Sequence, residues 1–453
     1  MEIITLCFFT IGMSDFTKAL KEKFRDPVFA FQYTQVVRYV VSFLISIIMV
    51  RSALAADDLG QYEIIIFIAS ALTMFWSGGF RNALFAFYAK LEPNDQYRLP
   101  TQIFWLLCGI CVVIALLVGL FPTSLMNLFS QSADYTLYIY VILLVILSVP
   151  PTLVDAIYFL RKDVKALLSY THWSQLVSLF LTLMVAIFIP SLEKFIYALL
   201  LSYGLRFGYL VIFVLGAASF FDLSFGLISR YAIFAIPLIG TVFLGSMMDM
   251  IDGWFVTYYF DESYFPVFRY GAREMPLSAV LMSSLSMAII PSLSADSQGI
   301  IMLKRKVTSL MHWLFPVSGL LMIISPILFP LVYEAAYLDS AFIFNIYLLI
   351  LISRVLLPQS ICLAHHKTGI IIFSGMIEVV ANILLSFWWM NIWGIFGLAL
   401  ATVVAYFVQK IILVVYNRQK FGISLTDYID LKYYVFYSLS LIGIFFITLY
   451  IWK

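Results

Sequence analysis

The sequence predicts an all-α polytopic membrane protein whose two six-helix lobes enclose a central cavity, with one extra C-terminal transmembrane helix. Its composition, its long apolar runs and the charges between those runs support this prediction. Apolar residues make up 63% of the 453 positions and charged residues only 11%, whereas an ordinary globular domain has about 25% charged residues. Because hydrocarbon offers no partner for backbone polar groups, apolar runs of about 20 residues are expected to form helices.

Apolar runs long enough to cross a bilayer follow one another along the chain. The first six lie near residues 34–50, 62–80, 102–121, 136–159, 171–189 and 194–216. The second six lie near residues 229–248, 265–290, 308–331, 341–362, 369–391 and 394–417. A further run at 432–452 predicts the additional transmembrane helix, and a short apolar stretch at 3–13 with basic residues after it predicts an amphipathic cytoplasmic segment.

Basic residues between the runs predict the orientation, because cytoplasmic loops of membrane proteins are rich in Lys and Arg. With the N-terminus placed in the cytoplasm, most Lys and Arg residues fall in cytoplasmic gaps, whereas the opposite gaps contain only Arg51, Lys194 and Lys453. A missed span would invert this pattern downstream of the error. We therefore expect both ends of the twelve-span core to be cytoplasmic.

The even number of core spans predicts two lobes that enter the membrane from the same side. We expect an N-terminal lobe at 1–217, a C-terminal lobe at 218–417, and a cytoplasmic linker with the extra helix at 418–453. A short Arg-Tyr echo near the start of each half supports this division. Parallel repeats of this kind generally enclose a cavity between them.

The gaps between spans limit the function, because none is long enough for a soluble catalytic domain. We therefore expect a transport protein rather than an enzyme, with no resident cofactor or metal and no nucleic-acid partner. The cysteines lie in or beside apolar runs, which predicts no disulfide framework. Cys108 and Cys111 form a C-x-x-C inside such a run, where we expect no redox role. We interpret His365–His366 as a solvated turn rather than a metal site.

Several short motifs resemble those of a known family. They are Met49–Leu54, Asp58–Tyr62, Gly78–Ala83, Phe268–Leu277, Pro291–Ser294, Leu331–Tyr333 and His366–Gly369. Their pattern of small residues, tyrosines and prolines at span ends resembles polysaccharide flippases, which belong to the multidrug/oligosaccharidyl-lipid/polysaccharide exporter superfamily. The resemblance implies a two-lobed transporter in a bacterial cytoplasmic membrane that moves lipid-linked sugar units outward by alternating access.

Arginines at membrane depth are the candidate substrate-binding residues. A charge in mid-bilayer costs about 2.5 kcal/mol or more, so it usually faces a cavity or a partner. Arg206 lies near the middle of its span on a polar and aromatic face, and we expect it in a cavity or a buried pair. Arg269 and Arg273 are four residues apart, which predicts that they stack on one helical face, with an anion or a carboxylate between them and the rest of the protein. Arg354 lies inside its span toward the cytoplasmic end.

Arg38 and Arg81 stand at the cytoplasmic ends of the first two spans. Contact with lipid headgroups explains these positions as well as a substrate site does, and the sequence leaves both alternatives open. Arginine offers a planar fork that holds phosphate oxygens bidentately. The surplus of arginine over acid at membrane depth therefore favours a lipid-linked pyrophosphate as substrate.

Polar residues form a second candidate set. Ser374, Glu378, Asn382 and Ser386 recur every four residues, which predicts a polar stripe along one helix face. The stripe is expected to face protein or water. Glu378 is a candidate for binding sugar, for pairing with an arginine, or for carrying a coupling proton or ion.

Two further acids are candidates for the cavity or for ion coupling. Asp155 follows the kink that Pro150–Pro151 predicts in its span. Glu274 is a partial partner for the arginines beside it in the sequence. Asp252, at the external end of the seventh span, is expected in a solvated loop instead.

The predicted function is a flippase for polyprenyl-pyrophosphate-linked oligosaccharide units, used to build O-antigen, capsule or exopolysaccharide. Its expected partners are the lipid-linked substrate, membrane lipids and a polysaccharide polymerase, with H⁺ or Na⁺ as a coupling ion. One alternative is a cation-coupled antiporter of drugs or metabolites on the same fold, which would favour a more acidic or apolar cavity. Another is a membrane-embedded glycosyl or acyl transferase, which would need a catalytic acid or His motif that the sequence does not present.

Overall fold

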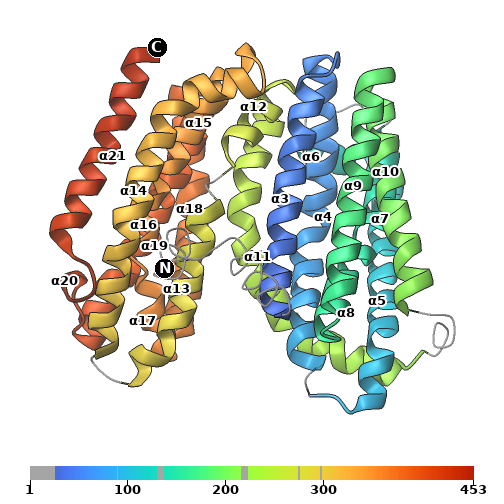
Figure 1. The fold of residues 1–453 in the computed structure, drawn as a ribbon, viewed down its shortest axis with the longest axis horizontal. Coiled ribbons are helices and arrows are strands. Elements are labelled where there is room, and N and C mark those ends of the chain that lie inside the picture. Colours follow the sequence, from blue (N-terminus) through green and yellow to red (C-terminus); the bar gives the residue numbers. More distant parts are fainter. Residues whose placement is uncertain are drawn as a thin grey trace, which may run out of the picture. The chain divides into compact units, whose positions relative to one another are not determined.

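The computed structural model describes residues 26–88, 90–129, 137–215, 223–273, 276–295 and 298–452. Every regular element in these ranges is a helix (Figure 1). Eleven of these helices are long and apolar enough to cross a membrane, or twelve if the bent pair Phe225–Gly240 and Gly245–Tyr259 is one span. These findings confirm the prediction of an all-α polytopic membrane protein. The predicted segment at 3–13 and Glu274 lie outside the described residues.

The chain divides into two compact units. The first comprises Met1–Met126 and Ala133–Phe243, and the second comprises Asn127–Ser132 and Leu244–Lys453. The predicted lobe boundaries at residues 217 and 417 stay predictions.

Several helices of the first unit begin at a proline, and α3 and α9 follow a capping aspartate. Its helices are α3 (Pro27–Val50), α4 (Ala56–Tyr88), α5 (Pro93–Leu120), α6 (Pro122–Phe129), α7 (Tyr138–Ser148), α8 (Leu153–Leu160), α9 (Val164–Phe188), α10 (Leu192–Tyr209) and the start of α11 (Phe225–Tyr259). Before α3, the Asp26 carboxylate accepts a hydrogen bond of 3.1 Å from the backbone N–H of Val28, which satisfies one of the N–H groups left open at a helix start. Between α7 and α8, Pro150–Thr152 forms a 3₁₀ turn. The structure confirms the interruption predicted at these prolines, and Asp155 lies in the first turn of α8.

A close contact between α4 and α11 depends on one glycine. A Cβ atom at Gly79 would lie 2.5 Å from the backbone of Ile239, so a larger residue would push the two helices apart. Next to it, the Tyr231 hydroxyl donates a hydrogen bond to the carbonyl oxygen of Phe80. The rings of Tyr231 and Phe80 also stack, with centroids 5.8 Å apart. This tyrosine is therefore buried with its hydroxyl satisfied.

The second unit contains longer helices and several broken ones. Its helices are the end of α11, α12 (Tyr264–Gly271), α13 (Pro276–Ala295), α14 (Gln298–Val332), α15 (Leu338–Leu348), α16 (Ile350–Arg354), α17 (Pro358–Ala364), α18 (Thr368–Trp393), α19 (Ile395–Phe421), α20 (Leu425–Tyr428) and α21 (Leu431–Trp452). The span predicted at 341–362 contains α15, α16 and α17. Its last break falls at Leu357, which has a φ of +45°, because Pro358 disfavours the α conformation of the residue before it.

The span predicted at 265–290 contains two helices, α12 and α13. Since α12 ends at Gly271, Arg273 lies outside it, and the prediction that Arg269 and Arg273 stack on one helical face is wrong. The next helix begins at Pro276, and proline is suited to a first helical position because its missing N–H leaves nothing unpaired there.

Helix α21 confirms the predicted extra helix and packs along α14. The Tyr437 hydroxyl lies 2.8 Å from Nδ1 of His312, and the Tyr437 ring stacks on Phe315 with centroids 5.5 Å apart. Near the start of α21, the Lys304 ammonium donates to the carbonyl oxygen of Thr426 at 2.7 Å. These contacts attach the extra helix to the second unit.

Candidate functional site

A polar cavity of about 370 Å³ lies within the first unit. Its walls come from α3, α4, α8, α9 and α10 and from the turn between α7 and α8. Small and hydroxyl-bearing side chains form much of the wall, and the charged residues in it are Arg38, Asp155 and Arg206. The volume lies at the lower end of the range of about 300–1,000 Å³ that is typical of small-molecule sites.

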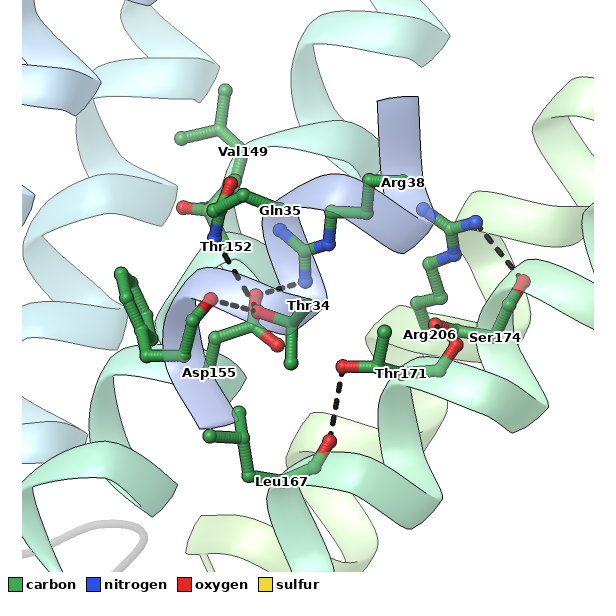
Figure 2. Close-up of polar contacts among 11 residues, drawn as sticks. Thr34, Gln35, Arg38, Val149, Thr152, Asp155, Leu167, Thr171, Ser174 and Arg206 are labelled. Atoms are coloured by element: carbon green, nitrogen blue, oxygen red, sulfur yellow. Dashed lines mark hydrogen bonds and ion pairs between the residues drawn. The ribbon is translucent and has the colours of Figure 1, made fainter. Parts of the chain in front are cut away.

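Arg38 and Asp155 form an ion pair inside this cavity. Nη2 of Arg38 donates to Oδ2 of Asp155, although the two residues are 117 positions apart in the sequence (Figure 2). The Asp155 side chain is 5% exposed and the Arg38 side chain 29%. Of the two alternatives left open for Arg38, the geometry therefore favours a cavity position over a contact with lipid headgroups.

Arg206 lies on another side of the same cavity. Its Nη2 donates to the carbonyl oxygen of Ser174 at 3.0 Å (Figure 2). The same Nη2 also donates to the hydroxyl of Ser178. The Ser178 hydroxyl in turn lies 2.6 Å from that of Ser202. The guanidinium carbon is 5.3 Å from the centroid of the Tyr203 ring, a cation–π contact. The cavity position predicted for Arg206 is the one observed.

The charges around the cavity are unbalanced. Arg38, Arg81 and Arg206 all act electrostatically on the single carboxylate of Asp155, and Arg38 also acts on Arg81. Three positive charges around one negative charge leave a positive surplus in a partly desolvated site, where electrostatic interactions are stronger than in water. Such a site attracts an anion.

Aromatic rings continue the wall along α8, α9 and α10. The hydroxyls of Tyr158 and Tyr209 lie 2.9 Å apart, and Tyr170 packs against Tyr209 with centroids 4.9 Å apart. Trp173 stacks on Tyr209 with centroids 5.5 Å apart and contacts Tyr170 as well, at 6.3 Å. Tyr170 and Tyr203 face the cavity. Rigid rings with polar ends of this kind are suited to contacts with the faces and hydroxyls of a sugar.

The arginines of the second unit contact aromatic rings. The guanidinium of Arg269 lies 5.9 Å from the centroid of Phe265, and that of Arg273 lies 5.0 Å from Tyr270. Arg354 lies 5.9 Å from the centroid of Tyr406 and borders a cavity of only about 10 Å³. The structure therefore groups Arg38, Arg81 and Arg206 in one site and places the other three arginines in the second unit.

The predicted polar stripe on α18 is buried against protein. Ser374, Asn382 and Ser386 are each 0% exposed and Glu378 is 4% exposed. The Ser386 hydroxyl donates to the side-chain oxygen of Asn382 at 2.9 Å. Nδ2 of Asn382 donates to the hydroxyl of Thr402 on α19 at 3.0 Å. The stripe therefore joins α18 to α19 through hydrogen bonds.

The same network extends to Asp252 on α11, and this corrects the prediction of a solvated loop there. Asp252 is 4% exposed, and its Oδ2 accepts hydrogen bonds of 2.5 Å from both Tyr347 and Thr402. The prediction was wrong because α11 continues to Tyr259, well beyond the expected end of the span at residue 248. Asp252, which was expected to follow the helix, therefore lies inside it.

Lys410 is a buried charged residue that was not among the candidates predicted from the sequence. It is 8% exposed, and its ammonium donates to the side-chain oxygens of Gln359 at 3.1 Å and Gln409 at 2.9 Å. It acts electrostatically on Glu378, so the acid of the predicted stripe lies close to a buried lysine. A lysine inside the predicted span at 394–417 was the signal that could have identified it.

The cysteine and histidine residues considered in the sequence analysis form no metal or redox cluster among the described residues. Cys111 and Cys362 are buried free thiols, and Cys108 is partly buried. His365 stacks on Phe421 with centroids 4.1 Å apart. Among the residues that the structure describes, no group of three or more His, Cys, Asp and Glu side chains is placed to hold a metal ion.

Several solved structures of membrane transporters share this fold. The lipid II flippase MurJ in an inward closed conformation aligns with a TM-score of 0.71 and 18% identity, over 92% of each chain. A multidrug resistance MATE family transporter of the MOP superfamily, inward-facing, aligns with a TM-score of 0.62 and 12% identity, over 84% of this chain and 94% of the other. A MATE transporter from Vibrio cholerae gives 0.54 and 12%, over 90% and 99%. The chain has the fold of MOP-superfamily membrane transporters.

The amino-acid sequence also matches a known protein family. The family described as polysaccharide biosynthesis protein matches residues 48–342, more than half of the chain, and the chain belongs to this family. No curated protein sequence matches it. The family and the fold expected from the sequence motifs are confirmed.

Proposed function

We propose that this protein flips polyprenyl-pyrophosphate-linked oligosaccharide units from the cytoplasmic to the external leaflet of a bacterial cytoplasmic membrane. The observation that carries this proposal is the cavity that Arg38 and Arg206 line with Asp155, where Arg81 adds a third positive charge acting on the carboxylate. A pyrophosphate brings the negative charge that this site lacks, and guanidinium groups bind phosphate oxygens through paired hydrogen bonds. The units would serve the assembly of O-antigen, capsule or exopolysaccharide.

Such a transporter performs no covalent chemistry. Its task is to lower the cost of moving a charged, hydroxyl-rich headgroup through hydrocarbon, which is several kcal/mol or more for each unpaired polar group. The arginines replace the water around the phosphates, and the serine, threonine and tyrosine side chains of the cavity replace the water around the sugar. The lipid tail stays in the bilayer while the lobes alternate between inward and outward access.

We further propose that an H⁺ or Na⁺ gradient drives this cycle, and that the buried acids Glu378 and Asp155 are candidates for coupling, together with Glu274. Support comes from Glu378, whose Oε1 is buried with no hydrogen-bond partner among the described residues. The N-terminus would lie in the cytoplasm, and a polysaccharide polymerase would consume the flipped units. If Glu378 carries the coupling ion, Glu378→Gln should remove the response of flipping to an imposed ion gradient.

The proposal is tested by complementation in a bacterium that makes a surface polysaccharide but whose own copy of this transporter has been deleted. The amount of surface polysaccharide is measured. The native protein should restore the surface polysaccharide, whereas Arg206→Gln should reduce it about tenfold or more, because a hydrogen bond to a charged group contributes about 1.5–3 kcal/mol. Lipid-linked units should then accumulate on the cytoplasmic side. Arg305→Gln is the matched control, since Arg305 is exposed on α14 and lies outside the cavity.

The likeness to MATE transporters makes a drug or metabolite antiporter the second candidate function. The positive charge of the cavity argues against the cationic substrates that such an antiporter would be expected to carry. If Arg206→Gln leaves the surface polysaccharide intact while tolerance to cationic drugs changes, the antiporter is correct and the flippase is not. Both variants need equal amounts of protein in the membrane for this comparison.

A further inference from the structure

Two buried side-chain atoms of the residues that line the cavity have no hydrogen-bond partner among the described residues. Oδ2 of Asp155 is occupied by Arg38, but Oδ1 is buried without a partner among the described residues. Nη2 of Arg206 is occupied by Ser174 and Ser178, but Nε is likewise buried and unpartnered there. Both side chains line the same cavity of about 370 Å³. Because nearly all buried polar atoms in proteins are hydrogen-bonded, this pair points to a ligand.

The two unsatisfied atoms require opposite kinds of group. A carboxylate oxygen accepts hydrogen bonds only, so Oδ1 of Asp155 needs a hydroxyl or an amide N–H and repels a phosphate oxygen. The guanidinium of Arg206 donates only, so its Nε needs an acceptor, and an anionic oxygen is the strongest one. A phosphate alone would satisfy Arg206 but leave Asp155 unpaired. A molecule with a hydrogen-bond donor next to a phosphate satisfies both.

The rest of the cavity fits a sugar next to that phosphate. Hydroxyl and amide side chains, including Ser70, Thr73 and Gln175, line it together with the Tyr170 ring. Its volume of about 370 Å³ suits one sugar with its phosphate rather than a whole oligosaccharide. The part of the substrate in this cavity is thus the junction between lipid phosphate and first sugar.

We propose that Asp155 recognises the sugar that bears the phosphate. Its carboxylate accepts a hydrogen bond from a hydroxyl or acetamido N–H of that sugar while Arg206 binds the phosphate. This inference rests on the proposed function and deepens it, because it assigns selectivity for the first sugar to one carboxylate. A site built around a hydrogen bond to a substrate group strongly rejects an analogue that lacks the group, since its own polar atom is then left unpaired. The preferred class is a sugar 1-phosphate with a donor on the carbon next to the phosphate-bearing carbon, and its 2-deoxy analogue is rejected.

The experiment measures binding to the full-length protein in detergent by calorimetry. The probes are glucose 1-phosphate, galactose 1-phosphate, their 2-acetamido counterparts, 2-deoxyglucose 1-phosphate and inorganic pyrophosphate. At least one of the first four should bind about tenfold or more tightly than the 2-deoxy compound. If none does so with the native protein, the inference is overturned whatever the variants do.

Asp155→Asn should strengthen one binding affinity and weaken a preference, a combination that misfolding would not produce. Removing the carboxylate removes a charge that repels phosphate, so pyrophosphate should bind severalfold more tightly. The preference for the sugar phosphate over its 2-deoxy analogue should fall about tenfold, because the charged acceptor is lost. Asp57→Asn is the matched control, since Asp57 is exposed in the first turn of α4, and it should change neither quantity.

The two proposals fail in different ways in this experiment. If Asp155→Asn leaves the preference for the sugar phosphate unchanged, or weakens pyrophosphate and sugar phosphate equally, Asp155 does not read the sugar. If Arg206→Gln still weakens pyrophosphate binding in that case, the proposed function stands without the further inference. If Arg206→Gln leaves pyrophosphate binding unchanged, the proposed phosphate site itself is wrong.

Discussion

Removing Arg38 should destabilise the first unit more than removing its partner Asp155. Arg38→Gln leaves a carboxylate that is 5% exposed, whereas Asp155→Asn leaves a guanidinium group that is 29% exposed and can recover part of its hydration. Breaking a buried ion pair by removing one partner costs about 3–5 kcal/mol. Since Arg81 and Arg206 still act on Asp155, we expect the low end, about 3 kcal/mol, for Arg38→Gln. For Asp155→Asn we expect about 1 kcal/mol, because the exposed guanidinium is screened by water.

Thermal unfolding in detergent, followed by tryptophan fluorescence, measures this difference. In a unit of this size, about 1 kcal/mol changes the melting temperature by about 2–4 °C. Arg38→Gln should therefore lower the melting temperature by about 6–12 °C and Asp155→Asn by about 2–4 °C. The double variant should melt above Arg38→Gln alone, because no buried charge is left without its partner. If the two single effects simply add in the double variant, the ion pair does not stabilise the protein in the way described.

The second unit supplies three further predictions, each read by the same unfolding assay. Thr402→Val removes a donor from the buried carboxylate of Asp252 and should cost about 1–3 kcal/mol, whereas an unchanged melting temperature would show that water replaces the hydroxyl. Glu378→Gln should destabilise the protein more than the double variant Glu378→Gln/Lys410→Met, because the single change leaves a buried lysine without its counter-charge; equal melting temperatures would contradict the coupling. Gly271→Ala should cost about 1–3 kcal/mol, since the added Cβ would lie 2.5 Å from a carbonyl oxygen of α15, and an unaffected alanine variant would mean that α12 can move away.

Apolar runs predicted the helices well, because hydrocarbon forces each backbone polar group to pair within its own segment. That rule is local, so composition and run length are enough to apply it, as α21 illustrates. Helix ends were predicted less well. Run length does not give the end of α11 at Tyr259 or the end of α12 at Gly271, and the errors at Asp252 and Arg273 follow directly from these ends.

The partners of the charged residues could not be predicted from the sequence. Depth in the membrane identified Arg206 and Glu378 as residues that avoid lipid, because an unpaired charge there is costly. Which partner each would meet depends on how each helix is rotated about its axis and on which helix packs beside it. Glu378 faces Lys410, a neighbour along the hairpin of α18 and α19. From the sequence alone, sugar binding, a pair with an arginine and ion coupling all stayed open for Glu378.

By itself, the sequence determined a helical membrane protein, the positions of most spans and the few charges that must be sheltered from lipid. Only the tertiary structure decided that Arg38 and Arg206 line one cavity with Asp155, and that Arg81 also acts electrostatically on this carboxylate. It also decided that the polar stripe of α18 joins helices instead of lining an open site. The physical reason is that avoidance of lipid is a property of each segment. A binding site, in contrast, depends on side chains more than a hundred residues apart, which packing alone brings within hydrogen-bonding distance.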